Sequence, residues 1–401
     1  MTGVKNFIFM FSLVSDLLFF CVASMVGYTF EGSESSPIYK LFMSGIGGLV
    51  IAMVIYDILQ KKIRTTLSFW VLLILLPIFV VSSYFIETGA YNINKENSSQ
   101  YLLYMLCFSF TASCTGIYIA HQGIERFAKY LDVIMLIMTM SFFGAIVSTI
   151  AGLASVGGTS YQTMSYMGAF AFNINLCMIL WGDKHERFKL FKGEKWNLVA
   201  YGLLLVQLLT CLISGGRGGF LVIVAGSAYM LCRSKKLGRA LTLCGCAIFV
   251  SLIAGRFSDS DLAKRLEQST MRTFNYIGGD SDQIQKVSGR SGVYEKAINN
   301  IKEDNYMGRG LFRSINEGYP HNFMLEVMVQ GGLIYLIIWM ILIVILTMKV
   351  NFLINYQNAY ILIPLSIYPF IQLLFSGTYL TSPLFWFIIS YTWTRCEITA
   401  A

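Results

Sequence analysis

Long apolar runs separated by short polar stretches dominate this sequence. An apolar stretch of about 20 residues is long enough to cross the hydrocarbon core of a bilayer as a helix. The runs are continuously apolar, without the ~10-residue alternation that marks the strands of a membrane barrel. Twelve helices are predicted in this way, at 7–29, 39–59, 67–86, 101–120, 131–153, 165–182, 197–214, 218–232, 238–254, 323–348, 359–376 and 380–394. The predicted fold is therefore an all-α polytopic integral membrane protein.

The longest polar stretch separates the ninth predicted helix from the tenth. Within it, helices are expected at 261–274 and 291–303, with the turn residues Gly278-Gly279-Asp280 between them. The predicted division of the chain is 1–254 for helices one to nine, 255–322 for a long polar loop, and 323–401 for the last three helices.

The composition agrees with a membrane protein and excludes several other classes. Of the 401 residues, 56% are hydrophobic and 13% are charged, whereas a soluble domain carries about 25% charged residues. Aromatic residues make up 15% of the chain, which excludes intrinsic disorder. The nine cysteines are too sparse for a disulfide-stapled secreted module and lack the spacing of a zinc site. Neither a metal nor a cofactor is expected.

Lysine and arginine are distributed unequally between the two sets of short loops. With the N-terminus inside, 17 of the 30 basic residues fall in inside loops, 3 in short outside loops and 10 in the long polar stretch. Basic loops stay in the cytoplasm, so both termini are predicted to be cytoplasmic and the long stretch to lie outside. The net charge of +8 follows from this bias, and no nucleic-acid partner is expected.

His321 is the candidate catalytic residue that this topology places at the outer face. It stands in the sequence Tyr319-Pro320-His321-Asn322, where the long polar stretch meets the tenth predicted helix. A histidine there is either an interfacial side chain that ends a loop or a general base that works near neutral pH. The other two histidines, His121 and His185, fall among Lys and Arg in inside loops and are expected to be solvated.

Arg217 lies in the glycine-rich outer turn Ser214–Gly219, between the seventh and eighth predicted helices. It is either an arginine that extends its head group to the membrane interface or a bidentate ligand for phosphate. Gly216 and Gly218 favour the second interpretation, because glycines let the backbone approach a ligand closely.

Arg290 lies in Ser288–Gly292, directly before the second helix expected in the long stretch. It is either one of several solvated basic residues or a side chain that strengthens the preference of a helix N-terminus for anions. The triplet Gly308–Gly310 lacks the strand and the lysine of a phosphate-binding loop and is expected to be a turn. Asp16 and Asp132 are expected to face the bundle interior or an interface.

The order of these motifs resembles the O-antigen polymerase and ligase superfamily. The resemblance rests on Ser214–Gly218, Ser288–Ile301, Gly308–Gly310 and an H-N-x-x-L-E motif formed by His321, Asn322, Leu325 and Glu326. The segment Tyr161–Tyr166, at the entry of the sixth helix, is similar to Wzy-type polymerases and favours them over WaaL-type ligases.

This resemblance implies an enzyme of the bacterial inner membrane, a metal-independent inverting glycosyltransferase that acts on the periplasmic face. Its expected substrate is an oligosaccharide linked to undecaprenyl pyrophosphate, its surroundings are membrane lipid, and a chain-length regulator is an expected partner. The resemblance also implies that Arg217 and Arg290 bind the pyrophosphate and that His321 deprotonates or orients the acceptor hydroxyl. Supporting roles are expected for Gly216, Gly218, Tyr319 and Asn322.

Several functions remain open at this point. An O-antigen polymerase extends a lipid-linked glycan and is favoured, whereas a ligase transfers the glycan to lipid A–core. A lipid-linked glycan flippase is a further alternative, since about a dozen helices with buried polar residues also suit a transporter. Because the candidate cations gather at one face and the sequence has no internal repeat, the enzyme is preferred. A purely structural membrane scaffold is the weakest alternative.

Overall fold

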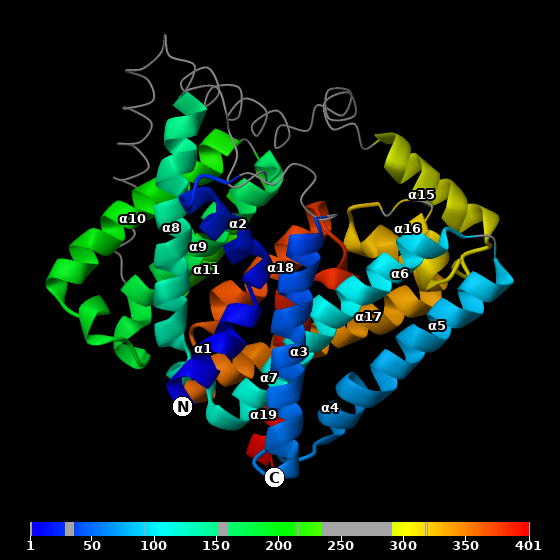
Figure 1. Ribbon diagram of the computed structural model, residues 1–401, viewed down its shortest axis with the longest axis horizontal. Helices are drawn as coiled ribbons and strands as arrows, with labels where there is room; N and C mark the ends of the chain where they lie inside the picture. The colour runs from blue at the N-terminus through cyan, green and yellow to red at the C-terminus, as the bar shows by residue number, and fades with distance from the viewer. Residues whose placement is uncertain are drawn as a thin grey trace. The chain divides into compact units, whose positions relative to one another are not determined.

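A computed structural model describes residues 2–28, 36–91, 93–150, 159–214, 216–234, 291–316, 318 and 320–400. Every regular element in these ranges is helical (Figure 1), as the apolar runs predict. The chain divides into two compact units. The first comprises Met1–Met43, Ile124–Gly279 and Ala359–Gln372, and the second comprises Ser44–Gly123, Asp280–Asn358 and Leu373–Ala401. The division into 1–254, 255–322 and 323–401 stays a prediction about topology.

In the first unit, helix α9 is the central element. It is buried along nearly its whole length, and α8, α10 and α11 pack against it (Figure 1). Gly168 lets α10 approach closely, since a Cβ at that position would stand 3.0 Å from the Gln207 carbonyl oxygen. The helices are α1 (Thr2–Ser12), α2 (Ser15–Met25), α8 (Ala128–Ile150), α9 (Tyr161–Trp181), α10 (Glu194–Ser214) and α11 (Arg217–Ser234).

The first predicted helix is two helices and not one. α1 and α2 meet at an angle of 95°, which corrects the continuous helix expected over 7–29. Serine hydroxyls take part in the break, because Ser12 Oγ donates to the Phe9 carbonyl and Ser15 Oγ donates to the Ser12 carbonyl. Such side chains compete with the helical backbone for hydrogen bonds.

In the second unit, two long rods and α17 and α19 surround a core of aromatic side chains. One rod consists of α4 (Leu67–Trp70), the π-helical turn η2 (Val71–Leu75) and α5 (Leu76–Ala90), which follow one another in line (Figure 1). The other consists of α6 (Lys95–Tyr104), the π-helical turn η3 (Met105–Phe110) and α7 (Thr111–Gln122). The remaining helices are α15 (Ser291–Glu303), α16 (Leu311–Asn316), α17 (Phe323–Gln357) and α19 (Pro383–Ala400).

The other helices are α3 (Pro37–Leu59) and α18 (Leu362–Phe375), with short 3₁₀ turns at η4 (Ile124–Arg126), η5 (Gly182–Lys184), η6 (Lys189–Phe191) and η7 (Tyr379–Thr381). Within the described ranges, six helices are long and apolar enough to cross a membrane, or seven if α1 and α2 form one bent crossing. The chain is thus a multi-pass membrane protein, and the count of twelve crossings stays a prediction.

Most predicted segments coincide with helices in the structure. The helix expected at 291–303 has those bounds, as α15. The helix expected at 323–348 is longer, because α17 continues to Gln357, and α16 was not expected. The segments 238–254 and 261–274 lie outside the described residues. α17 also contains a break at Gly332, whose φ of 72° and ψ of −167° are not helical.

Candidate functional site

The glycine-rich turn after α10 rests directly on the start of α9. Ser165 Oγ, which is fully buried, donates to the Gly216 carbonyl at 2.7 Å. A Cβ at Gly216 would overlap the Ser165 side chain, and one at Gly218 would overlap the Tyr166 hydroxyl. Only glycine fits at these two positions without displacing α9. The turn and the segment 161–166, two motifs that stand apart in the sequence, therefore form one contact.

α11 begins at Arg217, so the predicted anion ligand occupies the first position of an 18-residue helix. The amide N–H groups of that first turn lack helical acceptors, and the helix dipole adds partial positive charge there. Gly218 and Gly219 leave this end of the helix without bulky side chains. A helix start favours an anion in this way, but Gly218 and Gly219 are packed against Tyr166 and Ser165 of α9, so anion binding at Arg217 stays a prediction. The side chain of Arg217 lies outside what the structure describes.

His321 has an unusual backbone conformation. Its φ of 51° lies in the left-handed region, which residues other than glycine rarely adopt. Strain of this kind persists only where the surrounding structure enforces it, and it gathers at functional sites. The side chain is half-buried. His321 is thus held in a fixed place at the entrance to α17, where the sequence predicts it.

Asn322 ends the turn that holds His321 and begins α17. Its Oδ1 accepts a hydrogen bond from the Leu325 amide at 3.2 Å, which makes it the N-cap of the helix. Its Nδ2 donates to the Leu374 carbonyl at 3.2 Å. Asn322 therefore fixes the helix start next to His321, and its supporting role in the site stays a prediction.

Glu326, the last residue of the H-N-x-x-L-E motif, is buried one turn into α17. Its Oε1 accepts hydrogen bonds from Thr378 Oγ1 and from Gln330 Nε2. The Tyr379 hydroxyl in turn donates to Gln330 Oε1 and lies 3.2 Å from the Tyr335 hydroxyl. Glu326 Oε2 has no hydrogen-bond partner among the described residues. A polar chain thus runs from the start of α17 toward its middle.

Leu325 has a structural role in the same motif. It packs with Met328 against Ala297 and Ile301 of α15, and Val329 completes this cluster. α15 is thereby fixed along the first turns of α17. Arg290 precedes the first residue of α15, as the sequence predicts, but Arg290 and Tyr319 themselves lie outside the described residues.

The triplet Gly308-Arg309-Gly310 fills the break in α17. The Arg309 and Gly310 amides donate to the carbonyls of Val329 and Gln330 at 2.7 and 2.9 Å. A Cβ at Gly308 would stand 2.6 Å from the backbone of Gly331. The turn expected at this triplet lies instead just before it, at 304–306, and the triplet itself is an irregular segment; its place in the fold explains its glycines.

Glu87 of α5 caps the short helix that follows this triplet. Its carboxylate accepts hydrogen bonds from the amides of Leu311, Phe312 and Arg313 at 2.8 to 2.9 Å. A Cβ at Gly310 would stand 2.6 Å from the same carboxylate. A buried acid from a distant segment thus neutralises the N-terminus of α16, about ten residues before His321.

The prediction that the other two histidines are solvated is wrong for His185. His185 is buried, and burial together with the nearby Arg187 charge lowers its pKa to about 4. His121 accepts a hydrogen bond from the Arg64 amide through Nε2 and contacts the Ile117 carbonyl through Nδ1. His121, which is half-buried, lies in the last turn of α7, and His185 directly follows η5.

Asp132 faces the interior of the first unit, as predicted. Arg187 donates two hydrogen bonds of 2.8 Å to its carboxylate, and both side chains are buried. A planar guanidinium matches a carboxylate in this paired geometry. The intramembrane acid is therefore neutralised by an arginine from the adjoining loop.

The predicted site residues fall into two groups. Gly216, Gly218 and the start of α11 belong to the first unit, and His321 and Asn322 belong to the second. The structure brings the members of each group together, while the meeting of the two groups stays a prediction. Within the described residues, no cluster of His, Cys, Asp and Glu suited to a metal ion occurs.

Sequence reasoning assigned no role to Glu326 or Glu87. A signal for Glu326 exists in the sequence, because an acidic residue inside an apolar run is costly in lipid and marks a functional or structural site, whereas Glu87 follows the run predicted at 67–86. Thr378 and Tyr379, which join Glu326 to the middle of α17, carry no such signal and are identified by the fold alone.

A comparison with protein families finds one match. Residues 202–340 match the family described as O-antigen ligase, a stretch that includes Arg217, Arg290 and His321. No curated protein and no solved structure matches the chain. Members of this family are glycosyltransferase-like enzymes of polysaccharide assembly, and the match does not separate polymerases from ligases. Residues 202–340 of this chain are therefore similar to the family described as O-antigen ligase.

Proposed function

We propose that the protein is a polymerase that joins lipid-linked oligosaccharide repeat units outside the cytoplasm. The observation that carries the proposal is the contact between the glycine-rich turn and the segment 161–166. That segment resembles polymerases, and Ser165 binds the Gly216 carbonyl next to the predicted phosphate ligand Arg217. This contact links the polymerase-like segment to the proposed anion site.

In the proposed reaction, the hydroxyl of the acceptor sugar attacks the anomeric carbon of the donor glycan. The bond between that carbon and the pyrophosphate oxygen breaks, and the configuration inverts. His321 takes the proton of the attacking hydroxyl. Arg217, Arg290 and the N-terminus of α11 offset the negative charge that develops on the departing undecaprenyl pyrophosphate. The energy of the activated donor drives the step, so no nucleotide is required.

A ligase is the second candidate, and the family description for residues 202–340 favours it. It would use the same donor, the same arginines and the same base. The two functions differ only in the acceptor, which is another lipid-linked repeat unit for a polymerase and lipid A–core for a ligase.

The test is a reconstitution of the purified protein in proteoliposomes with a defined lipid-linked oligosaccharide. A ladder of longer lipid-linked glycans without lipid A–core supports the polymerase. Product that appears only when lipid A–core is added supports the ligase. A His321→Ala variant that is expressed and folded should lose the product in either case, whereas a His121→Gln variant should keep it.

A third outcome would contradict both candidates. If the protein moves the lipid-linked oligosaccharide between leaflets without changing its length, it is a transporter. A glycan-degrading enzyme added outside the vesicles measures this movement, because it cleaves only the outward-facing substrate.

A further inference from the structure

The loop that joins α9 to α10 lies at the surface of the membrane. The segments Gln162–Lys184 and Glu194–Ser214 on its two sides are each long and apolar enough to cross a bilayer. Because only 185–193 separate them, the loop cannot extend far from the lipid head groups. It lies at the opposite end of α9 and α10 from the contact between 161–166 and the glycine-rich turn. It is therefore distinct from the proposed pyrophosphate site.

The loop is held in one shape by the protein itself. Arg187 at its centre donates two hydrogen bonds to Asp132 of α8. The ring of Phe188 packs edge-on against that of Tyr130, also of α8, with 5.9 Å between the centroids. Phe191 is buried. The backbone of this part of the loop is thus fixed before any ligand binds.

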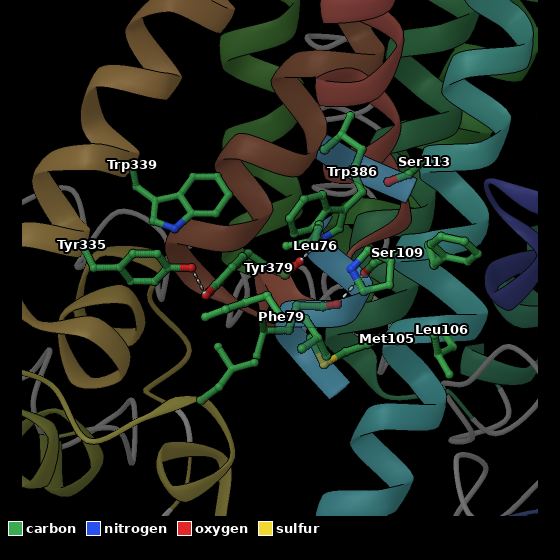
Figure 2. A pocket seen from close by; sticks show the side chains of 16 residues that line it. Leu76, Phe79, Met105, Leu106, Ser109, Ser113, Tyr335, Trp339, Tyr379 and Trp386 are labelled. Carbon is green, nitrogen blue, oxygen red and sulfur yellow. Dashed lines mark hydrogen bonds between the residues drawn. The ribbon is translucent and has the colours of Figure 1, made fainter. Parts of the chain in front are cut away.

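Leu190 is exposed in the middle of this fixed segment. It belongs to η6, a single 3₁₀ turn, and is 73% exposed. On a helix that can span a membrane, an exposed apolar side chain faces lipid, as we expect for Phe79 of α5, which is 55% exposed and is labelled in Figure 2. Leu190 lies on no such helix, but it stands at the boundary between two of them. An apolar side chain there can enter the zone between head groups and acyl chains.

Two lysines accompany Leu190. Lys189 and Lys192 are exposed and form no ion pair among the described residues, whereas Lys184 of the same loop lies 4.0 Å from Asp183. The Lys192 amide donates to the Lys189 carbonyl at 3.3 Å, so the two lysines are one 3₁₀ turn apart. Residues at that spacing lie on the same face of the turn. The loop thus presents two positive charges together, next to an apolar side chain.

We propose that this surface, formed by Lys189, Leu190 and Lys192, binds the head group of an anionic phospholipid. The lysine ammonium groups contact the lipid phosphate, and Leu190 lies among the first carbons of the acyl chains. Basic residues at a membrane surface attract anionic lipids in this way, and apolar side chains beside them insert at the boundary of the acyl region.

Charge and hydrophobicity together select this occupant. A soluble anion such as phosphate would pair with Lys189 and Lys192 but would leave Leu190 in water. A zwitterionic lipid would cover Leu190, but its own positive group would compete with the lysines for its phosphate. An anionic phospholipid satisfies both parts of the surface. A basic loop alone marks only the side of the membrane; the exposed leucine is what adds a lipid contact.

The experiment uses the full-length protein in phosphatidylcholine nanodiscs that contain a small fraction of photoactivatable phosphatidylglycerol. The reactive group is placed at the top of an acyl chain, and mass spectrometry measures labelling of peptides that cover 182–196. This lipid should label the loop more than a phosphatidylcholine with the same group does. Lys189→Gln and Lys192→Gln should each lower this preference about fivefold, or ~1 kcal/mol.

Lys184→Gln is the matched control, because Lys184 is an exposed lysine of the same loop that already has an acidic neighbour. It should keep the wild-type preference. Leu190→Ser tests the apolar part and should lower labelling by phosphatidylglycerol. Since all these side chains are exposed, each variant should keep the wild-type melting temperature.

Equal labelling of the loop by the two lipids would overturn the proposal. The same loss of preference in Lys184→Gln as in Lys189→Gln would also overturn it, because the attraction would then come from the charge of the whole loop. An excess of inorganic phosphate at constant ionic strength should not compete; if it abolishes the preference, the surface binds a soluble anion and not a lipid. None of these measurements requires glycosyl transfer, so their outcome is independent of the proposed function.

Discussion

Two arginines flanked by glycines, Arg217 and Arg309, look alike in the sequence but have different surroundings. Arg309 forms ion pairs with Asp304 and Glu303, residues that shortly precede it in the chain. Its flanking glycines fit the break in α17. Around Arg217, by contrast, the sequence contains no acidic residue between Glu194 and Asp259. Its flanking glycines fit the start of α9.

The comparison separates the role of the flanking glycines from the role of the arginine. In both places the glycines serve close packing of backbone against a neighbouring helix. Arg309 is paired with acids that shortly precede it in the chain, whereas Arg217 has no acid close to it in the sequence, and its side chain lies outside what the structure describes. Arg187 follows the structural pattern, since it is paired with Asp132. Arg217 is the position where a substrate pyrophosphate is expected to supply the negative charge.

The largest expected effect is on glycosyl transfer in Arg217→Ala. Loss of one group that stabilises developing charge lowers the rate by about 10²- to 10³-fold, while the folded protein keeps its melting temperature. Arg217→Lys should have a transfer rate little higher than that of Arg217→Ala, because an ammonium cannot make the paired contact of a guanidinium. The rate of product formation by purified protein measures both variants.

Arg309→Ala is the matched variant for this comparison. It should lower the melting temperature, since Asp304 loses its partner, and leave the specific activity of the folded fraction within a few-fold of the wild type. The comparison fails if Arg309→Ala abolishes transfer in folded protein while Arg217→Ala does not.

The next effect is on stability in Glu87→Ala, which removes the acceptor for three amides at the start of α16. Buried donors left without acceptors cost about 1–3 kcal/mol, so the detergent-solubilised protein should melt at a lower temperature. Glu96→Ala changes an exposed acid in the neighbouring α6 and should shift stability by less than about 0.5 kcal/mol. Equal melting temperatures for the two variants would exclude the capping role of Glu87.

Gly218→Ala tests whether the turn beside Arg217 needs a glycine at position 218. The added methyl group overlaps the Tyr166 hydroxyl, and overpacking of this kind costs about 1–3 kcal/mol. We expect a lower melting temperature together with reduced transfer. Gly202→Ala, in α10, provides the control, because a Cβ there meets nothing within 4 Å and alanine favours a helix. A Gly218→Ala protein as stable and active as Gly202→Ala would show that the turn does not need glycine.

The smallest expected effect is on the pH dependence of stability. It comes from His185, the neighbour of the structural arginine Arg187. The pKa of His185 is lowered to about 4 in the folded protein, while the unfolded chain takes up a proton near 6.5. Its contribution to stability is therefore complete above pH 6.5 and is lost as the pH falls toward 4. Between pH 7.5 and 5.5 the loss is about 1 kcal/mol, which melting curves at the two pH values measure. His185→Leu should remove this component; an unchanged pH dependence would mean that another group causes it.

The fold was predictable where the chain is continuously apolar. Segments such as α3, α9 and α10 are helical because a bilayer leaves no other way to satisfy the backbone. The breaks were not predictable in this way. The bend after Ser12 and the break at Gly332 depend on hydrogen bonds outside the regular helical pattern, such as that from the Leu333 amide to the Tyr306 carbonyl.

Candidate site residues could be selected from the sequence by type, and their roles stay predictions, whereas the residues that hold them in place could not be selected. His321, Asn322 and the glycines of the turn stand out because of their place at the ends of apolar runs. The supports come from residues distant in sequence, such as Ser165 for Gly216 and Thr378 for Glu326. Hydrogen-bond partners of that kind leave no local pattern for the sequence to reveal.

The central claim is that Arg217 and His321 act on one substrate, which requires them to lie close together. The most direct measurement is cross-linking of Arg217→Cys with His321→Cys by a short bifunctional thiol reagent, after the nine native cysteines are replaced by alanine or serine. Arg217→Cys with Gln357→Cys, at the far end of α17, is the control pair. The account predicts that the first pair cross-links and the second does not. Cross-linking of the control pair alone would contradict it.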